Sequence, residues 1–87
     1  MRDKLQTSFK EAVNTFVDNK THSNFEEIVR TAFAINPEIA TYLKEDCRMP
    51  IRVKGDKLKF GSQTRPFDTI PEKEMSRAAL NLRAMVS

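Results

Sequence analysis

Apolar positions recur with a helical period along the first half of the chain. From residue 3 to residue 18 one side of a helix is apolar and the other is polar, which predicts an amphipathic helix. A second apolar stripe begins near Phe25 and ends before Pro37, because the residue that precedes a proline is disfavoured in helical geometry. Asn36 and Pro37 also suit the start of a third helix, which we expect to end near Asp46.

Two similar start signals mark the second helix and the last helix. Ser23 precedes Glu26 by three residues, and Thr69 precedes Glu72 by the same interval, so both pairs match a capping box. In such a box the hydroxyl and the carboxylate bond reciprocally to the free backbone N–H groups of the first turn. On this interpretation His22 lies in an exposed linker just ahead of the second helix.

Between residues 50 and 60 the period changes from helical to two, with apolar and basic residues in strict alternation. Gly55 and Asp56 stand at the centre of this stretch and predict a two-residue hairpin turn. The expected cross-strand pairs are Lys54 with Lys57, Val53 with Leu58, Arg52 with Lys59, and Ile51 with Phe60. One face of the hairpin is then apolar and the other is wholly cationic.

The expected core combines the apolar sides of these elements. Phe67 is expected to turn inward from a loop, and Tyr42 is expected to be partly buried with its hydroxyl in water. The predicted core residues are Leu5, Phe9, Val13, Phe16, Phe25, Ile28, Val29, Phe33, Ile39, Leu43, Ile51, Val53, Leu58, Phe60, Met75 and Leu82.

These elements predict an α+β fold in one small globular domain, residues 1–87, with three N-terminal helices, a two-stranded antiparallel β-hairpin and a C-terminal helix. Three helices followed by a hairpin resemble a winged-helix module in element order alone. A winged helix would place its third helix in the DNA major groove. Here that helix carries Glu38, Glu45 and Asp46, which phosphates would repel.

The charge of the chain is concentrated in one segment. Residues 48–65 hold six basic residues and one acidic residue, a net charge of +5. The rest of the chain holds nine basic and eleven acidic residues, a net charge of −2. With 39% hydrophobic and 31% charged residues, the composition is that of a folded domain, and its positive character belongs to the hairpin segment.

The residue types in the chain give little support for a catalytic function. Cys47 and His22 are the only cysteine and histidine, and no third residue is placed to orient them as a nucleophile and its base. Two such residues are too few for the usual zinc site, and two glycines do not make a phosphate-binding loop. We therefore expect a protein that is not an enzyme and that uses neither a metal nor a cofactor.

The sequence also favours a cytoplasmic location. No apolar run approaches the roughly 20 residues that span a bilayer, and nothing after Met1 resembles a signal peptide. A single cysteine suits a reducing compartment. We expect no membrane partner.

The cationic hairpin has two interpretations, which the sequence leaves open. Lysines on a two-stranded ribbon can prevent edge-to-edge aggregation. Alternatively, the basic residues bind an anionic surface, either an acidic patch on a protein or the phosphates of a nucleic acid. The candidate binding residues are Arg48, Arg52, Lys54, Lys57, Lys59 and Arg65.

The last helix offers a second candidate surface. Its stripe of alanine and methionine either completes the core or forms an interface that includes Arg77, Ala78 and Met85, in which case a homodimer is possible. The resulting hypothesis is a small non-catalytic regulatory binding protein, an inhibitor or adaptor, that acts stoichiometrically on a protein partner. The alternative is an accessory protein that contacts RNA or DNA phosphates through the hairpin.

Overall fold

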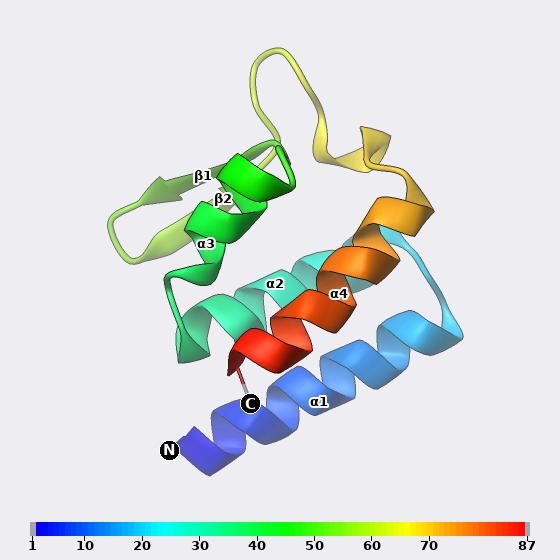
Figure 1. Ribbon diagram of the computed structural model, residues 1–87, viewed down its shortest axis with the longest axis vertical. Coiled ribbons are helices and arrows are strands. Elements are labelled where there is room, and N and C mark those ends of the chain that lie inside the picture. The colour runs from blue at the N-terminus through cyan, green and yellow to red at the C-terminus, as the bar shows by residue number, and fades with distance from the viewer. Residues whose placement is uncertain (1, 87) are drawn as a thin grey trace.

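The computed structural model describes residues 2–86, and the elements follow the expected order of helices, hairpin and C-terminal helix (Figure 1). The α+β class is thereby confirmed. No helix among these residues is long and apolar enough to cross a membrane. The elements are α1 Arg2–Asp18, α2 His22–Ile35, α3 Ile39–Thr41, a π-helical turn (η1) Tyr42–Asp46, β1 Ile51–Lys54, β2 Lys57–Phe60, a 3-10 turn (η2) Phe67–Thr69, and α4 Glu72–Val86.

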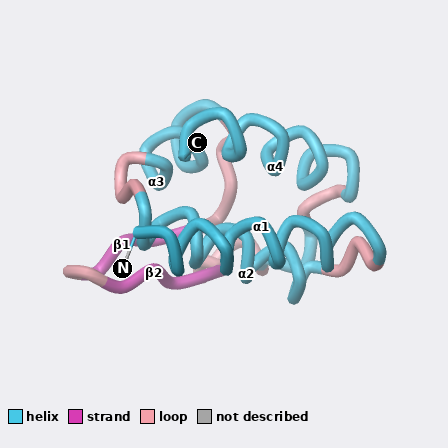
Figure 2. The backbone as a smooth tube through the Cα atoms, turned by 90° about the horizontal axis from the view of Figure 1, so that it is seen from below, coloured by secondary structure: helices cyan, strands magenta, loops and turns pink. Residues whose placement is uncertain are grey.

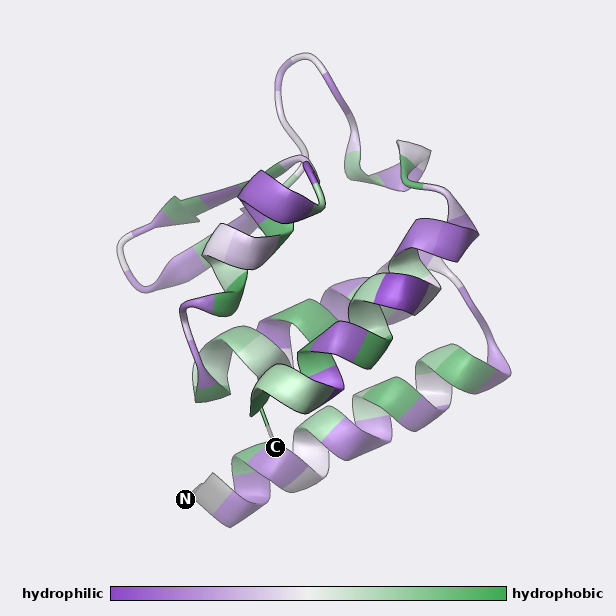
Figure 3. Cartoon of the chain, viewed as in Figure 1, coloured by the Kyte–Doolittle hydropathy of each residue, from purple (hydrophilic) through white to green (hydrophobic). Residues whose placement is uncertain are grey.

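Helix α2 is the central element of the fold. It packs against α1, α3, α4 and β2. Figure 2 shows α3 and α4 on one side of the molecule and α1, α2 and the hairpin on the other. In Figure 3, α1 and α4 alternate between hydrophilic and hydrophobic positions, as amphipathic helices do. Each therefore turns one apolar side toward α2 and leaves a polar side in solvent.

Phe25 occupies the middle of the core and has no exposed surface. Its ring centroid lies 5.8 Å from that of Phe16 in α1 and 5.9 Å from that of Phe67 in η2. Phe67 in turn meets Phe60 of β2 edge to face, with centroids 4.8 Å apart. These aromatic contacts join α1, α2, the hairpin and the segment before α4, and they confirm that Phe67 turns inward.

Most of the predicted core is confirmed. The predicted residues that are buried are Phe9, Val13, Phe16, Phe25, Ile28, Val29, Ile39, Leu43, Ile51, Met75 and Leu82. Three more, Phe33, Leu58 and Phe60, are half-buried against the core, and Leu5 is half-buried at the start of α1. Buried residues that the sequence pattern did not single out are Met49, Ile70 and Val86.

Val53 was expected in the core, and that expectation is wrong. The side chain is 43% exposed, whereas Ile51, two residues earlier on the same face, is buried. Figure 1 shows the hairpin projecting beyond the helices, with β1 leading toward the free turn. The apolar face is therefore covered by helices only near the base of the hairpin, and Val53 lies toward its tip.

The expected capping box at Ser23 is also wrong, because α2 begins earlier. Thr21 is the N-cap, and its Oγ1 accepts a hydrogen bond of 3.1 Å from the backbone N–H of Asn24. His22 is consequently the first helical residue and not an exposed linker residue. Its Nε2 lies 2.7 Å from the carbonyl oxygen of Ile70, so the ring joins the start of α2 to the segment before α4.

The second expected capping box is likewise not formed. Thr69 belongs to η2, and its hydroxyl donates to the carbonyl oxygen of Pro66 over 2.7 Å instead of capping α4. Pro71 comes directly before α4, and its carbonyl oxygen accepts the backbone N–H of Met75 over 3.1 Å. The Thr69 hydroxyl therefore bonds within the 3-10 turn and does not cap α4.

The third helical segment ends where the sequence indicates, but it starts two residues later than expected, at Ile39, because Pro37 and Glu38 form a turn ahead of it. Asn36 Oδ1 accepts the backbone N–H of Glu38 over 3.1 Å, and the segment ends at Asp46. It changes from α3 into a π-helical turn, in which the N–H of Cys47 bonds to the carbonyl oxygen of Tyr42 over 3.2 Å. The Tyr42 hydroxyl is not left to water, since it accepts a 2.6 Å hydrogen bond from Asn81 Nδ2 in α4.

Candidate functional site: the cationic face of the hairpin

The predicted hairpin register is confirmed at all four pairs. Lys54 lies opposite Lys57, and Arg52 lies opposite Lys59. The turn between the strands contains Gly55, whose φ of +66° is a left-handed geometry that glycine adopts without strain.

Four basic side chains share the outer face of this hairpin, and we call them the cationic face: Arg52, Lys54, Lys57 and Lys59. All four are exposed. The opposite face carries Ile51, which is buried, and Phe60, which packs against the core. Strand β1 contacts α3 and strand β2 contacts α2, so the helices cover the apolar side and leave the cationic side in solvent.

The cationic face has no acidic partner among the residues described. The ion pairs among these residues are those of Arg30 with Glu26 and Glu27, which lie within α2. No ion pair reaches the hairpin lysines or Arg52. Because like charges directly opposite one another on a ladder repel, the face is an uncompensated concentration of positive charge.

Arg48 and Arg65 lie together at the base of the hairpin. The guanidinium Nη1 of Arg65 donates to the carbonyl oxygen of Arg48 over 3.0 Å. Arg48 has a φ of +53°, the one positive value for a residue other than glycine in the described chain. Arg65 therefore supports a strained turn between η1 and β1. Arg48 and Arg65 thus have a structural role in addition to their positive charge.

A groove lies beside the cationic face, between the hairpin and the C-terminal half of α2. Its volume is about 680 Å³. The residues that line this hairpin groove are Arg30, Phe33, Ala34 and Pro37 from the helical side, and Gly55, Asp56, Lys57 and Leu58 from the hairpin. Sequence reasoning missed it, because the groove exists only where two elements from different parts of the chain meet. A half-buried Phe33 and an exposed Pro37 give it an apolar lining.

Arg30 is the basic residue of this groove that comes from α2. Its guanidinium carbon lies 5.1 Å from the centre of the Phe60 ring, a cation–π distance. Glu26 and Glu27 hold the same guanidinium at 3.4 Å and 3.0 Å. The side chain is therefore fixed between α2 and β2, and its charge is already partly compensated.

The predicted second surface is divided by the fold. Ala78 lies in the core with 1% of its surface exposed, so it offers almost no surface to a partner. Arg77 and Met85 are exposed and line two adjoining cavities that share Tyr42 and Asp46. The alanine stripe of α4 thus completes the core, and only its flanks reach solvent.

The candidate catalytic residues lie in separate surroundings. His22 bonds to Ile70, whereas Cys47 lies beside Tyr42 and Arg77. Burial raises the pKa of the Tyr42 hydroxyl, the neighbouring Cys47 side chain acts in the same direction, and the hydrogen bond from Asn81 opposes it. The phenol is therefore a neutral hydrogen-bonding group at physiological pH.

Comparison with known proteins adds no functional information to this geometry. Neither family models, nor curated proteins, nor solved structures give a match to the chain. In the part of the chain that the structure describes, no three His, Cys, Asp or Glu side chains gather in a group that could hold a metal ion. The chemistry of the surfaces of the protein is therefore the basis for a functional assignment.

Proposed function

We propose that this chain is a small regulatory binding protein, an inhibitor or adaptor, that acts without catalysis on a protein partner with an acidic patch. The observation that carries the proposal is the cationic face, four exposed basic residues on one side of a hairpin with no ion pair among the described residues. Complementary charge across an interface steers association and selects the partner.

Folding alone gives no reason for this arrangement. Two like-charged pairs, Lys54 with Lys57 and Arg52 with Lys59, follow each other on the same face of the ladder, with the Val53–Leu58 pair between them on the other face. Each pair destabilises the hairpin by a few tenths of a kcal/mol, since solvent screens exposed charges. A binding role explains why these residues are all basic, because an acidic partner would relieve the repulsion.

A protein partner is favoured over a nucleic acid by the hairpin groove. Protein interfaces combine an apolar centre with a polar or charged rim. Here Phe33, Pro37 and Leu58 line an apolar groove directly beside Lys57. A phosphate backbone would use the lysines and leave such a groove empty, whereas an acidic protein can place an apolar side chain in it.

The alternative is an accessory protein that contacts RNA or DNA phosphates through the same residues. It is supported by the cationic face itself, because phosphate binding needs only closely spaced basic side chains. The two candidates differ in salt dependence. Phosphate binding weakens steeply and linearly on a logarithmic salt scale, whereas an interface with an apolar centre weakens less.

The test is affinity capture from a lysate of the source cells, with and without nuclease, using the wild-type chain and Lys54→Glu/Lys57→Glu. The control is Lys4→Glu/Lys20→Glu, which makes the same change of charge at exposed positions of α1 and of the loop after it. A protein retained with nuclease by the wild type and the control, but lost with the hairpin variant, supports the proposal. Capture that nuclease abolishes would support the nucleic-acid role.

The captured protein is then purified, and its affinity and stoichiometry are measured by calorimetry. We expect a fixed stoichiometric complex whose dissociation constant rises by tenfold or more, about 1.4 kcal/mol, in the hairpin variant. Equal affinity of the wild type and the variant would reduce the hairpin to an edge guard.

A further inference from the structure

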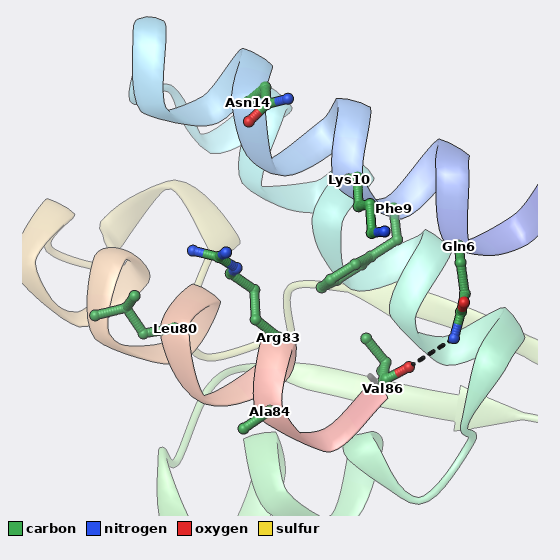
Figure 4. A pocket seen from close by; sticks show the side chains of 8 residues that line it. All are labelled: Gln6, Phe9, Lys10, Asn14, Leu80, Arg83, Ala84 and Val86. Atoms are coloured by element: carbon green, nitrogen blue, oxygen red, sulfur yellow. Dashed lines mark hydrogen bonds between the residues drawn. The ribbon is translucent and has the colours of Figure 1, made fainter.

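A second groove lies between α1 and α4, away from the hairpin (Figure 4). Its volume is about 660 Å³. The residues that shape it are Gln6, Phe9, Lys10, Leu80, Arg83 and Val86, and we call it the α1/α4 groove. It shares no lining residue with the hairpin groove and contains none of the residues of the cationic face.

The groove exists because α1 and α4 both pack against α2. The two helices run in opposite directions along it (Figure 1). At one end Gln6 Nε2 donates to the carbonyl oxygen of Val86 over 3.2 Å, which joins the start of α1 to the end of α4. Figure 4 shows Phe9 and Arg83 extending into the space between the helices and this hydrogen bond closing one end.

The groove has an apolar floor and apolar edges. Phe9 and Val86 form part of the floor and belong to the core. Leu80 on the α4 side is 64% exposed, and Val17 of α1 is 60% exposed. Val17 follows Lys10 by seven residues, two helical turns, so it lies on the same side of α1 and extends the apolar surface beyond the groove. These are the two most exposed large apolar side chains of the described residues.

The rim of the groove is basic. Lys10 and Arg83 line it from opposite sides, and both are exposed. Lys73 precedes Leu80 by seven residues and therefore lies on the same side of α4. None of these three residues forms an ion pair among residues 2–86. No carboxylate is among the lining residues either.

We propose that the α1/α4 groove binds an acidic amphipathic helix of a protein partner. Two antiparallel helices with a groove between them accept a third helix, whose apolar side chains at i, i+3 or i+4 fill the floor. From Gln6 to Asn14 the lining of α1 advances about 12 Å, roughly two helical turns at 1.5 Å per residue. Glutamates beside the apolar stripe of the bound helix would meet Lys10 and Arg83.

The chemistry of the groove disfavours two other occupants. A nucleic-acid backbone would satisfy Lys10 and Arg83, but it would leave Phe9 and Leu80 without an apolar partner. A second copy that docked by the same surface would follow two-fold symmetry, which brings the patch onto itself. That arrangement would set the unpaired basic residues of one copy against the same residues of the other.

The test uses three matched synthetic peptides of about 16 residues, long enough to form helix. The first has a leucine stripe flanked by glutamates, the second has lysine in place of each glutamate, and the third has serine in place of each leucine. Binding to the intact chain is followed by ¹⁵N–¹H NMR titration, which locates the contact, and by fluorescence anisotropy. We expect saturable binding of the first peptide only, with shifts at residues of α1 and α4.

Variants of the chain then separate this surface from the hairpin. Leu80→Ser and Arg83→Glu change exposed side chains, and each should weaken binding of the first peptide by about tenfold. Lys54→Glu/Lys57→Glu should leave peptide binding unchanged, so a failure of the proposed hairpin function would not remove this binding. Circular dichroism and NMR spectra of every variant confirm that it is folded.

Several results would overturn the inference. They are the lack of saturable binding by the first peptide, equal binding of the lysine peptide, and shifts confined to the hairpin. A single-stranded DNA oligonucleotide that produces the same α1 and α4 shifts and competes with the peptide would assign the groove to nucleic acid. Sedimentation that reveals a dimer of the chain, lost in Leu80→Ser, would assign it to a second copy.

Discussion

Lys54 and Lys57 lie directly opposite each other on either side of the Gly55–Asp56 turn, and neither has an ion-pair partner among the residues described. Solvent screens the repulsion between them, so the hairpin tolerates the pair. The hairpin therefore keeps two positive charges close together beside its turn.

Lys54→Glu/Lys57→Glu should change the free energy of unfolding by no more than about 1 kcal/mol, because one like-charged pair replaces another. The single variant Lys57→Glu places opposite charges across the ladder and should stabilise the hairpin by roughly 0.2–1 kcal/mol. Urea unfolding followed by circular dichroism measures both changes. A large destabilisation by the double variant would mean that the lysines have a role in folding.

Thr21→Ala should destabilise the protein by about 1 kcal/mol, because the α2 N-cap hydrogen bond to Asn24 is lost. Ser23→Ala is the matched control, since Ser23 is exposed and lies inside the helix instead of at its cap. Its effect should be within about 0.5 kcal/mol. Equal losses of stability in the two variants would mean that Thr21 is not the N-cap of α2.

Phe25→Ala should destabilise the protein by about 3–5 kcal/mol, enough to unfold a domain of this size. The ring is completely buried between Phe16 and Phe67, so truncation leaves a cavity. Phe33→Ala removes a half-buried ring from the hairpin groove and should cost less than half as much. Thermal unfolding followed by circular dichroism measures the loss of stability in both variants.

The same Phe33→Ala variant tests the groove as well as the fold. If the hairpin groove receives an apolar side chain of the partner, the folded variant should bind the captured partner more weakly than the wild type does. Unchanged affinity in a folded Phe33→Ala protein would limit the interface to the charged residues.

Gly55→Ala should destabilise the hairpin by about 1–2 kcal/mol, because φ at this position is +66°. An added Cβ meets no atom within 4 Å, so the loss is conformational and not steric. Gly55→Asn is the control, since asparagine tolerates left-handed geometry better, and its loss should be smaller. Denaturant unfolding measures the free energy of unfolding of both variants. Equal losses would mean that residue 55 does not adopt left-handed geometry.

Cys47→Ser should leave partner binding within about twofold of the wild type, because the thiol lies beside Tyr42, away from both grooves. Calorimetry with the captured partner is the measurement. A folded Cys47→Ser protein that had lost function would revive a nucleophilic role for this residue.

The register of the hairpin and the division of its two faces were predictable from the sequence because their determinants are local. Strict alternation of apolar and basic residues fixes the two faces, and Gly55–Asp56 fixes the turn and with it the register. The side of the hairpin that carries Arg52 and Lys54 follows at once. The helical stripes of α1, α2 and α4 are of the same kind, since each depends on residues a few positions apart.

The capping residues show where local signals compete. Thr21 and Ser23 are both acceptable caps by residue type, and the spacing to Glu26 favours Ser23. The structure starts the helix at His22, whose ring contacts Ile70 forty-eight positions later. A contact over such a distance along the chain depends on how whole elements pack, and no local pattern encodes it.

The sequence by itself determined the element order, the hairpin register and the cationic face, because each is set by the period of side chains within one or two neighbouring elements. Only the tertiary structure decided that Val53 is exposed, that Ala78 is buried, and that grooves lie beside Lys57 and Leu80. These features depend on where one element ends relative to another. The relative position of the elements is set by the packing of α1, α3, α4 and β2 on α2, to which residues far apart in the sequence contribute together.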